Sequence, residues 1–473
     1  MKSNNLKWFS IVLVISFIAI PIHALEIRGD VAGSVNGMSD LVDNSYTWSP
    51  QNFAGFDYDM DHDVGSDTLI TTLTEDGKLS GDAPYGIVYE TSNLTKMFSN
   101  AQPDMEYGKL RVSTIDSTNG IITLDNKDNA IILSKNKNTE IMPGIFIKVA
   151  DNDTLRYYIY KNITQPGTYE IRSLVAGTVN GLSNLEDDAF TWNTQNFAGF
   201  YYDIKKDIGT EWLKTTLTDD NNISGDPPYG IVYQTTAQTK DYEYWGWGSY
   251  NVIGFQGEEY FAGYVSSDNA EKNVLFREST DENSLSSEQL QKILMDDKTE
   301  VTLNKGESIK LKDGYVLFVK GINSEGQIYL ELQKDGKLVN KSFLAPSAYG
   351  ATNYDKTYCF HKNVGTQKDL VTIAVRFGST YEDEERALAV VDAIWQISDI
   401  PIDVRANMQY GKMTITSVDA NAGTITMDNK DNPITLTKKN DIELMPGIHI
   451  RTANNDTLRY YIYKTVTVGK APA

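Results

Sequence analysis

The sequence predicts an all-β protein built from tandem β-sandwiches. Short segments alternate apolar and polar residues, as in KLRVSTI from Lys109 and YVLFVKGI from Tyr315. Such alternation is typical of strands with one buried face. Two-residue turn signals separate many of these segments, at Asn36-Gly37, Asn180-Gly181, Asp313-Gly314 and Asp335-Gly336. Because such pairs favour tight hairpins, we expect many short strands in facing sheets.

The third observation is an internal duplication. EIRGDVAGSVNG from Glu26 returns as EIRSLVAGTVNG from Glu170, and the match continues at a constant offset of 144 residues. The register breaks after Thr91 and Thr235 and resumes at an offset of 303 through YGK, DNKDN, MPGI and NDTLRYYIY. The second copy therefore contains 159 additional residues. Matching ends around an unmatched middle indicate a self-contained unit inserted into a surface loop.

The first 24 residues have the features of a secretory signal peptide. Lys2 and Lys7 come before an apolar run, and Ala24 supplies a small residue for cleavage. The run is short for a membrane span, and the sequence leaves the mode of membrane anchoring open. The predicted division is residues 1–24 as signal peptide, 25–165 as β-sandwich copy one, 168–236 plus 404–465 as β-sandwich copy two, 237–403 as the insert and 466–473 as a C-terminal tail.

The insert is expected to be mainly β with one short helix. The segment SSEQLQKILMDD begins at Ser286, which forms a capping box with Gln289. Leu290, Ile293 and Leu294 would then share one face of a helix, so the sequence predicts a helix over residues 286–297.

The composition is strongly acidic. The chain carries 43 Lys and Arg against 64 Asp and Glu, a net charge of −21, which becomes −23 when Lys2 and Lys7 leave with the leader. Such a surface repels nucleic acid and anionic membranes and attracts cations. Cys359 is the single cysteine, so an intrachain disulfide is excluded.

Several sequence blocks resemble archaeal S-layer proteins of methanosarcinal methanogens. They include TWSPQNFAGFDYD and TWNTQNFAGFYYD, GDAPYGIVY and GDPPYGIVY, the insert segment KGESIKLKDGYVLFVKGINSEGQIYLELQKDGK, and VVDAIWQISD. The resemblance covers nearly the whole mature chain. It implies a secreted, lattice-forming cell-surface glycoprotein whose repeat unit has two β-sandwich subdomains, one inserted in the other. Copy one departs from that pattern because it lacks the insert, and the sequence ends without the expected stalk and hydrophobic anchor.

The function expected from this resemblance is structural. The chain would be an S-layer component or an S-layer-associated envelope glycoprotein, with other copies or other S-layer proteins as partners. We expect no enzyme activity and no required cofactor, because the sequence contains no HExxH, CxxC, GxSxG or Gly-rich phosphate loop. A hydrolase with paired carboxylates stays open as the enzymatic alternative, since acidic residues abound.

One acidic segment is a candidate cation site. DYDMDHD places Asp57, Asp59, Asp61 and Asp63 at alternate positions. On a strand these four carboxylates would lie along one face, where Ca²⁺ or Mg²⁺ would relieve their repulsion. The alternative interpretation is a solvated acidic strand face without a bound ion.

An aromatic stretch near the start of the insert suggests an alternative function. Trp245, Trp247 and Tyr250 are interleaved with glycines and could stack on sugars in a secreted carbohydrate-binding or adhesive module. Strand alternation over a core explains the same rings equally simply.

Six sequons satisfy the N-x-Ser/Thr rule for glycosylation in an exported protein. They begin at Asn93, Asn152, Asn162, Asn222, Asn340 and Asn455. Attached sugars would solubilise surfaces that make no lattice contacts.

Overall fold

The computed structural model is built almost entirely of strands. Strands make up 55% of the chain and helices 4%, which confirms the all-β fold class. The predicted signal peptide and residues 470–473 of the predicted tail lie outside the described residues. The structure describes residues 25–35, 38–92, 98, 100–150, 154–280, 283–382 and 386–469.

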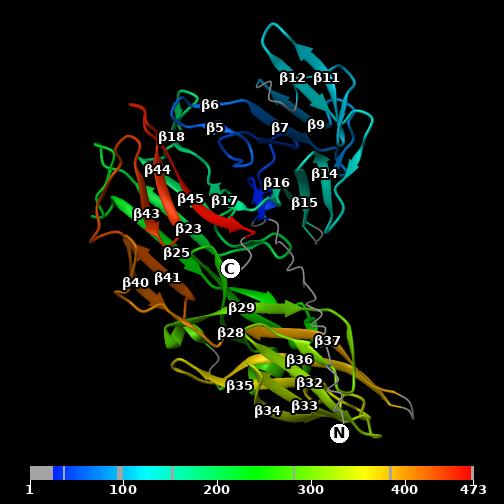
Figure 1. The fold of residues 1–473 in the computed structure, drawn as a ribbon. Coiled ribbons are helices and arrows are strands. Elements are labelled where there is room, and N and C mark those ends of the chain that lie inside the picture. The colour runs from blue at the N-terminus through cyan, green and yellow to red at the C-terminus, as the bar shows by residue number, and fades with distance from the viewer. Residues whose placement is uncertain are drawn as a thin grey trace, which may run out of the picture.

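Copy one forms two six-stranded antiparallel sheets around one core (Figure 1). Its strands are β1 (Leu25–Arg28), β2 (Ala32–Val35), β3 (Met38–Ser39), β4 (Ser45–Trp48), β5 (Tyr58–Asp59), β6 (Val64–Gly65), β7 (Asp67–Thr72), β8 (Lys78–Leu79), β9 (Gly86–Thr91), β10 (Glu106–Tyr107), β11 (Leu110–Asp116), β12 (Ile121–Asp125), β13 (Ile131–Ile132), β14 (Asn138–Met142), β15 (Ile145–Val149) and β16 (Arg156–Ile163). One sheet has the order β14-β15-β16-β2-β3, with β1 also on β16, and the other has the order β10-β11-β12-β9-β7-β4. The pairs β5–β6 and β8–β13 form short separate ladders.

Copy two repeats this topology with strands from both sides of the insert. They are β17 (Gly167–Arg172), β18 (Ala176–Val179), β19 (Leu182–Ser183), β20 (Ala189–Asn193), β21 (Tyr202–Asp203), β22 (Ile208–Gly209), β23 (Glu211–Thr216), β24 (Asn222–Ile223), β25 (Gly230–Thr236), β39 (Gln409–Tyr410), β40 (Met413–Asp419), β41 (Thr424–Asp428), β42 (Ile434–Thr435), β43 (Asp441–Met445), β44 (Ile448–Thr452) and β45 (Arg459–Val468). The sheet orders are β19-β18-β45-β44-β43, with β17 on β45, and β20-β23-β25-β41-β40-β39. Because β45 pairs with β17 up to Val468, the predicted boundary of the C-terminal tail at residue 466 falls inside a strand.

The insert adds two further sheets. Its strands are β26 (Gln238–Asp241), β27 (Ser249–Phe255), β28 (Glu258–Val265), β29 (Gln289–Asp297), β30 (Val301–Asn304), β31 (Ser308–Lys310), β32 (Tyr315–Ile322), β33 (Ile328–Lys334), β34 (Lys337–Leu344), β35 (Thr357–Val364), β36 (Gln367–Glu382), β37 (Ala387–Ile397) and β38 (Ile402–Asp403). Nine strands form one sheet along β26-β27-β28-β29-β37-β36-β35, while β31 to β34 form the other in chain order. The described helices in the insert are α1 (Val274–Glu278), α2 (Asn353–Lys356) and the 3-10 turns η1 (Trp245–Trp247), η2 (Ala270–Lys272) and η3 (Ser284–Ser287).

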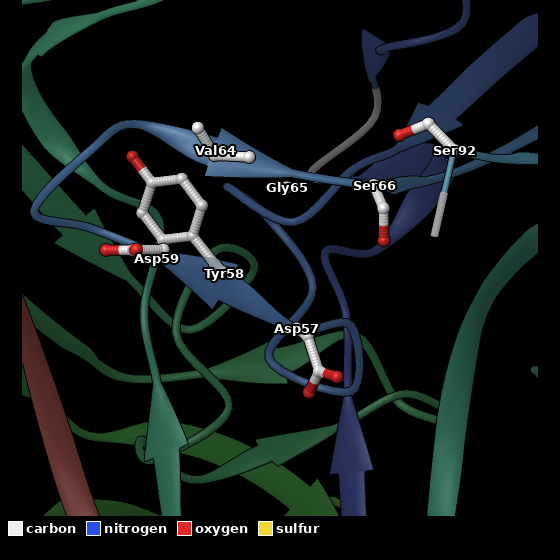
Figure 2. A pocket seen from close by; sticks show the side chains of 7 residues that line it. All are labelled: Asp57, Tyr58, Asp59, Val64, Gly65, Ser66 and Ser92. Carbon is white, nitrogen blue, oxygen red and sulfur yellow. The ribbon is translucent and has the colours of Figure 1, made fainter. Parts of the chain in front are cut away.

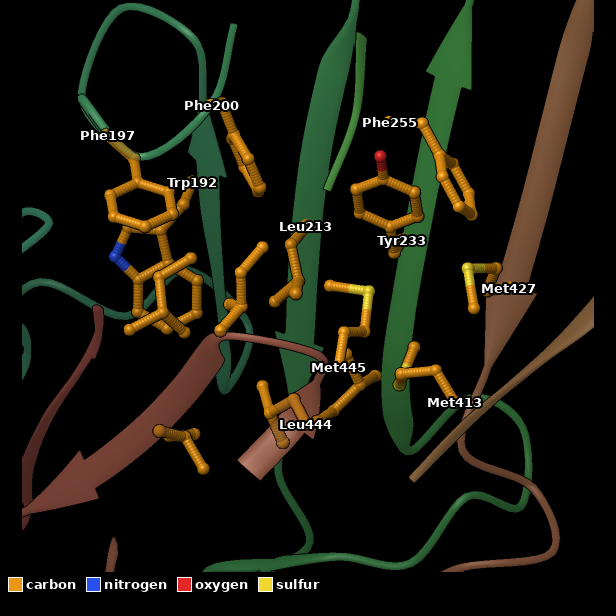
Figure 3. Close-up of a cluster of buried hydrophobic side chains, with 14 of the residues drawn as sticks. Trp192, Phe197, Phe200, Leu213, Tyr233, Phe255, Met413, Met427, Leu444 and Met445 are labelled. Atoms are coloured by element: carbon orange, nitrogen blue, oxygen red, sulfur yellow. The ribbon is translucent and has the colours of Figure 1, made fainter. Parts of the chain in front are cut away.

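The insert and copy two share a core. Trp192, Phe197 and Tyr233 are fully buried inside copy two, and Phe255 of the insert lies beside Tyr233 (Figure 3). Further insert residues that join this cluster are Ile253, Ala262, Leu285 and Leu290. The insert is therefore not a self-contained body, because part of its apolar surface is buried only against its host.

The helix predicted over residues 286–297 is wrong. The segment forms the turn η3 and then the strand β29, which pairs with β28, β37 and β38. The predicted cap residue Ser286 lies inside the turn. Asn283 caps the turn instead and accepts hydrogen bonds from the backbone nitrogens of Leu285 and Ser286. Sheet pairing outweighed a short helical pattern, because a run of this length fits either structure.

Three of the predicted hairpin turns are confirmed. Asn180-Gly181 joins β18 to β19, and Asp335-Gly336 joins β33 to β34. Asp313-Gly314 ends the four-residue connection between β31 and β32. Both residues of each pair have positive φ, which the two-residue turns at Asn180-Gly181 and Asp335-Gly336 require. The fourth pair, Asn36-Gly37, lies outside the described residues.

Candidate functional site

The acidic segment does not form the predicted strand face. The strand β5 ends at Asp59, and Asp61 and Asp63 belong to the turn that leads to β6, where Asp63 has a φ of 57°. Asp59 accepts hydrogen bonds from the backbone of Asp61 and His62. The turn ends the alternation, so the four carboxylates, including Asp57, do not share one face.

Two of these carboxylates contact copy two. Asp61 accepts a hydrogen bond from the backbone nitrogen of Asn454 at 2.6 Å. Asp63 accepts one from the backbone nitrogen of Asn180, also at 2.6 Å. In the part of the chain that the structure describes, no group of three or more His, Cys, Asp or Glu residues is arranged to hold a metal ion. The hairpin β5–β6 therefore serves the contact between the copies.

Two equivalent arginines form the centre of this contact, which we call the seam. Arg28 of copy one donates from Nη1 to the carbonyl oxygen of Gln195 at 3.1 Å. Arg172 of copy two donates from Nη1 to the carbonyl oxygen of Gln51 at 3.2 Å. Both pairs are related by the offset of 144 residues, so each copy inserts the same side chain into the same loop of the other. This is the reciprocity of an isologous dimer interface, here within one chain.

A second pair of arginines repeats the relationship at the ends of the seam. Arg156 donates to the carbonyl oxygen of Ile204 at 3.2 Å, and Arg459 donates to that of Met60 at 2.9 Å. Both guanidinium groups are almost fully buried. Buried backbone carbonyl groups need hydrogen-bond donors. These contacts therefore satisfy the carbonyl oxygens of the loops at which the two copies meet.

Apolar side chains from both copies flank the arginines. One mixed cluster contains Val31, Ala150, Tyr158, Tyr160 and Ile204. Its counterpart contains Met60, Val175, Ala453, Tyr461 and Tyr463. The members correspond position by position between the copies, so the seam has two matching halves.

The seam arginines are not among the functional residues predicted from the sequence. Their signal was present, because Arg28 and Arg172 recur in EIR and Arg156 and Arg459 recur in TLRYYIY. A charged residue that recurs in both copies beside apolar neighbours indicates a specific buried contact rather than a solvated surface.

Asp30 breaks the symmetry of the seam. It takes the position of Leu174 in copy two and is 9% exposed. Burial raises the pKa of Asp30 to about 7, while Arg28 acts in the opposite direction. Asp30 is therefore a buried acid that only one half of the seam contains.

The insert is attached to copy two through a polar seat. Lys240 of β26 lies 3.1 Å from the carboxylate of Asp203 and 2.9 Å from that of Glu259. The backbone nitrogen of Gly254 donates to Oγ1 of Thr210 at 2.6 Å. A lysine between two carboxylates and a backbone hydrogen bond fix the position of the first hairpin of the insert.

A groove on copy one is open to solvent. It has a volume of about 590 Å³, and its lining includes Asp57 and Asp59 on one side and Ser66 and Ser92 on the other (Figure 2). Val64 lies at its edge with 60% of its surface exposed. The groove therefore combines negative charge, hydroxyl groups and an exposed apolar residue.

The aromatic stretch does not form the predicted sugar-binding surface. Trp247 and Tyr250 are 2% and 0% exposed, and both belong to the core of the insert. Trp247 donates from Nε1 to Thr357 at 3.1 Å. Trp245 is 63% exposed, so one ring of the three faces solvent. The prediction is wrong for Trp247 and Tyr250, because the turn η1 and the strand β27 that carry them direct both rings into the core of the insert.

The sequons lie in different environments, and glycosylation at each remains a prediction. Asn93 and Asn152 lie outside the described residues. Asn162 and Asn222 are half-buried, and each has a buried side-chain oxygen without a hydrogen-bond partner in the structure. Asn340 accepts a hydrogen bond from the Tyr358 hydroxyl at 3.0 Å. Asn455 donates to the carbonyl oxygen of Asp61 at 2.9 Å, so it lies against the seam.

Comparison with known families identifies the chain. A family model described as "S-layer protein" matches residues 182–454, which is more than half of the chain and includes most of copy two and the insert. The chain belongs to the S-layer protein family. This S-layer protein is thus a structural component of the cell surface, as the resemblance in its sequence predicted.

Relatives of this S-layer protein extend the match. The "Major S-layer protein" of Methanosarcina mazei is 30% identical over 376 residues, which cover 78% of this chain and 50% of the relative. That of Methanosarcina acetivorans is 29% identical over 381 residues, which cover 78% and 51%. The chain therefore spans about half the length of the curated relatives it matches. S-layer proteins as a class assemble into surface lattices. Among the described residues of this S-layer protein, no helix is long and apolar enough to cross a membrane.

Proposed function

We propose that this chain is a non-enzymatic building unit of a cell-surface lattice, in which it associates with further copies of itself or with other S-layer proteins. Family membership carries the proposal. The structure adds support, because the seam fixes copy one on copy two and a shared core fixes the insert on copy two. A lattice needs units of fixed outline, since each contact must recur at the same angle.

Divalent cations are proposed as aids to this assembly. The mature chain carries a net charge of −23, so two copies repel each other at low ionic strength. Ca²⁺ or Mg²⁺ can bridge carboxylates of two chains, whereas a monovalent salt can only screen them. Asp61 and Asp63 already accept hydrogen bonds at the seam, so bridging would use carboxylates elsewhere on the surface.

Electron microscopy of the purified mature chain tests the proposal. We expect ordered sheets in millimolar Ca²⁺ and their loss after addition of a chelator. NaCl at matched ionic strength is the control, and equal assembly in NaCl would contradict cation bridging alone. Particles that stay dispersed under every condition, at concentrations where the relatives form sheets, would contradict the lattice proposal. Turnover of a surface polysaccharide would contradict the non-enzymatic role.

A further inference from the structure

The groove on copy one corresponds to the seat of the insert on copy two. Its seven lining residues are Asp57, Tyr58, Asp59, Val64, Gly65, Ser66 and Ser92. At the offset of 144 residues these become Tyr201, Tyr202, Asp203, Ile208, Gly209, Thr210 and Thr236. Copy two thus shows how this surface is filled when an extended hairpin is present.

Five of the seven equivalent positions contact the insert. Tyr201 donates to Glu259 at 2.6 Å, and Asp203 pairs with Lys240. The carbonyl oxygen of Gly209 accepts from Gln238 at 3.2 Å, and Thr210 accepts from Gly254. Ile208 belongs to the apolar cluster of Tyr242 and Trp247. In this seat the surface therefore holds a lysine, a glutamine side chain, one backbone amide and apolar side chains.

Copy one has polar and apolar side chains at the positions of the seat, although it lacks the insert. Asp59 stands where Asp203 binds the lysine, and Asp57 adds a second carboxylate in place of Tyr201. The clearest difference is exposure, because Val64 is 60% exposed while its counterpart Ile208 is 5% exposed. Asp59 already contacts Nδ1 of His62 at 2.7 Å, so the open apolar residue and the Asp57 carboxylate indicate a missing partner that is both apolar and basic.

One strand of the chain has these properties. β34 is the edge of the four-stranded sheet and, among the described strands, pairs with β33 alone. Leu338, Val339 and Phe343 are 48%, 44% and 71% exposed, and Lys337 and Lys341 are exposed on the same strand. An edge strand with exposed apolar residues is a ready partner for another chain. In Figure 1, β34 and the hairpin β5–β6 lie at opposite ends of the molecule, so they cannot meet within one chain.

We propose that the groove on copy one receives β34 from a second copy of this chain. Lys337 and Lys341 would face Asp57 and Asp59, and the apolar residues of β34 would cover Val64. The contact joins two different surfaces, so it can repeat head to tail from copy to copy, as a growing lattice requires. This inference rests on the proposed lattice function and names the surfaces that would form one of its contacts.

Complementary variants test this contact. Variant X carries Asp57→Lys with Val64→Lys, and variant Y carries Lys337→Glu with Phe343→Glu. We expect X and Y each to lose assembly, and their equimolar mixture to stop at dimers, because the strand of X can still enter the groove of Y. Val42→Lys is the matched control, since Val42 is 74% exposed outside the groove and its replacement should leave assembly intact. Analytical ultracentrifugation measures these four samples and the wild type. Assembly of X or Y at the wild-type level, or a mixture without dimers, would overturn the inference.

A cross-linking experiment separates this inference from the lattice proposal. Val64→Cys adds a reactive thiol, whereas burial raises the pKa of the native Cys359 thiol and keeps it inert. With a benzophenone on this thiol, we expect a cross-link to residues 337–344 of a second copy. A cross-link only within the same chain, for example to residues 93–99, would overturn the inference even if sheets form. A cross-link to β34 without sheets would support the inference and contradict the lattice proposal. A glycan on Asn340 of the native protein would also overturn it, because the sugar would lie on the docking strand.

Discussion

Phe98 of copy one and Phe255 of the insert occupy equivalent places in the two cores. Phe98 lies 6.0 Å from the ring of Tyr89, and Phe255 lies 6.1 Å from that of Tyr233, the counterpart of Tyr89. Phe98 comes from the short connection of copy one, whereas Phe255 comes from a strand of the insert. Copy one therefore supplies from a short loop the ring that copy two takes from a whole domain.

This equivalence predicts similar costs for the two truncations. Phe98→Ala and Phe255→Ala should each lower the free energy of unfolding by about 3–5 kcal/mol, because each leaves a cavity in a packed core. Phe98 is 3% exposed and Phe255 is 2% exposed. Urea denaturation of the two variants measures the effect. Leu182→Ala is the control, since Leu182 is 76% exposed and its loss should cost almost nothing. A small effect at Phe98 alone would show that the short connection does not replace the insert.

The same equivalence predicts the effect of deleting the insert. Removal of residues 237–403 takes Ile253, Phe255 and Leu290 out of the core of copy two. We expect this deletion product to be unstable or insoluble. Replacement of residues 237–407 by residues 93–104 of copy one should restore a folded protein, because Phe98 comes with the graft. Circular dichroism and thermal unfolding compare the two products, and a stable direct deletion would contradict the role given to Phe255.

The seam predicts that Arg28 and Arg172 stabilise the chain to a similar degree. Each Arg→Ala change leaves backbone carbonyl oxygens without donors at a buried interface, which should cost about 3 kcal/mol. Arg28→Lys should not restore the full stability, because an ammonium does not reproduce the geometry of the guanidinium fork. Arg111→Ala is the matched control, since its ion pair with Asp128 lies at an exposed surface and should cost at most about 1 kcal/mol. Equal urea midpoints for the Arg28 and Arg111 variants would rule out the proposed role of the seam.

The duplication made much of the fold predictable from the sequence. Copies that align at constant offsets must share a topology, and the strands on both sides of the insert pair in one sheet, as β25 does with β41. Local patterns were less reliable. The helix predicted from Ser286 and the strand predicted through Asp63 both failed, because a short periodic run does not reveal whether a neighbouring strand or a turn will determine its structure.

The arrangement of the seam and of the groove could not be predicted from the sequence. The recurring arginines mark residues of the seam, but no local pattern states how the two copies face one another or which turns of copy one enclose a groove. The alternation from Asp57 to Asp63 suggested a metal site, but the turn carries Asp61 and Asp63 across to copy two. Trp247 and Tyr250 suggested a sugar-binding surface beside Trp245. The turn η1 and the pairing of β27 with β26 bury both rings, and these features depend on the fold of the whole insert.

The buried tryptophan of copy one gives a direct test of the core. Trp48 is fully buried, and its Nε1 donates to the carbonyl oxygen of Asp30 at 3.0 Å. Trp48→Ala should therefore lower the free energy of unfolding by about 3–5 kcal/mol. Trp245→Ala serves as the control, because that ring is 63% exposed. An unchanged melting temperature for Trp48→Ala would show that the ring does not support the core.

Glu211 predicts a pH dependence of stability. It is buried between copy two and the insert, and its carboxylate accepts hydrogen bonds from the Tyr233 hydroxyl and from the backbone nitrogens of Tyr201 and Gly257, each at 2.8 Å. Burial raises the pKa of Glu211 to about 7, although these hydrogen bonds act in the opposite direction. The ordinary pKa of glutamate in an unfolded chain is about 4.3. The folded state therefore binds a proton more tightly than the unfolded state does.

The sign of the effect follows from this difference. The contribution of Glu211 to stability is fully present below pH 4.3 and is lost as the pH rises through about 7, with a slope of up to about 1.4 kcal/mol per pH unit. Glu211→Gln removes this titration, so the variant should gain stability relative to the wild type between pH 5 and pH 8. Any constant loss from altered hydrogen bonding cancels in that comparison. Urea denaturation at pH 5 and pH 8, monitored by tryptophan fluorescence, measures the free energy of unfolding of the variant and the wild type. Glu300→Gln is the exposed control, and a Glu211→Gln variant whose pH dependence matches that control would show that Glu211 stays ionised in the folded protein.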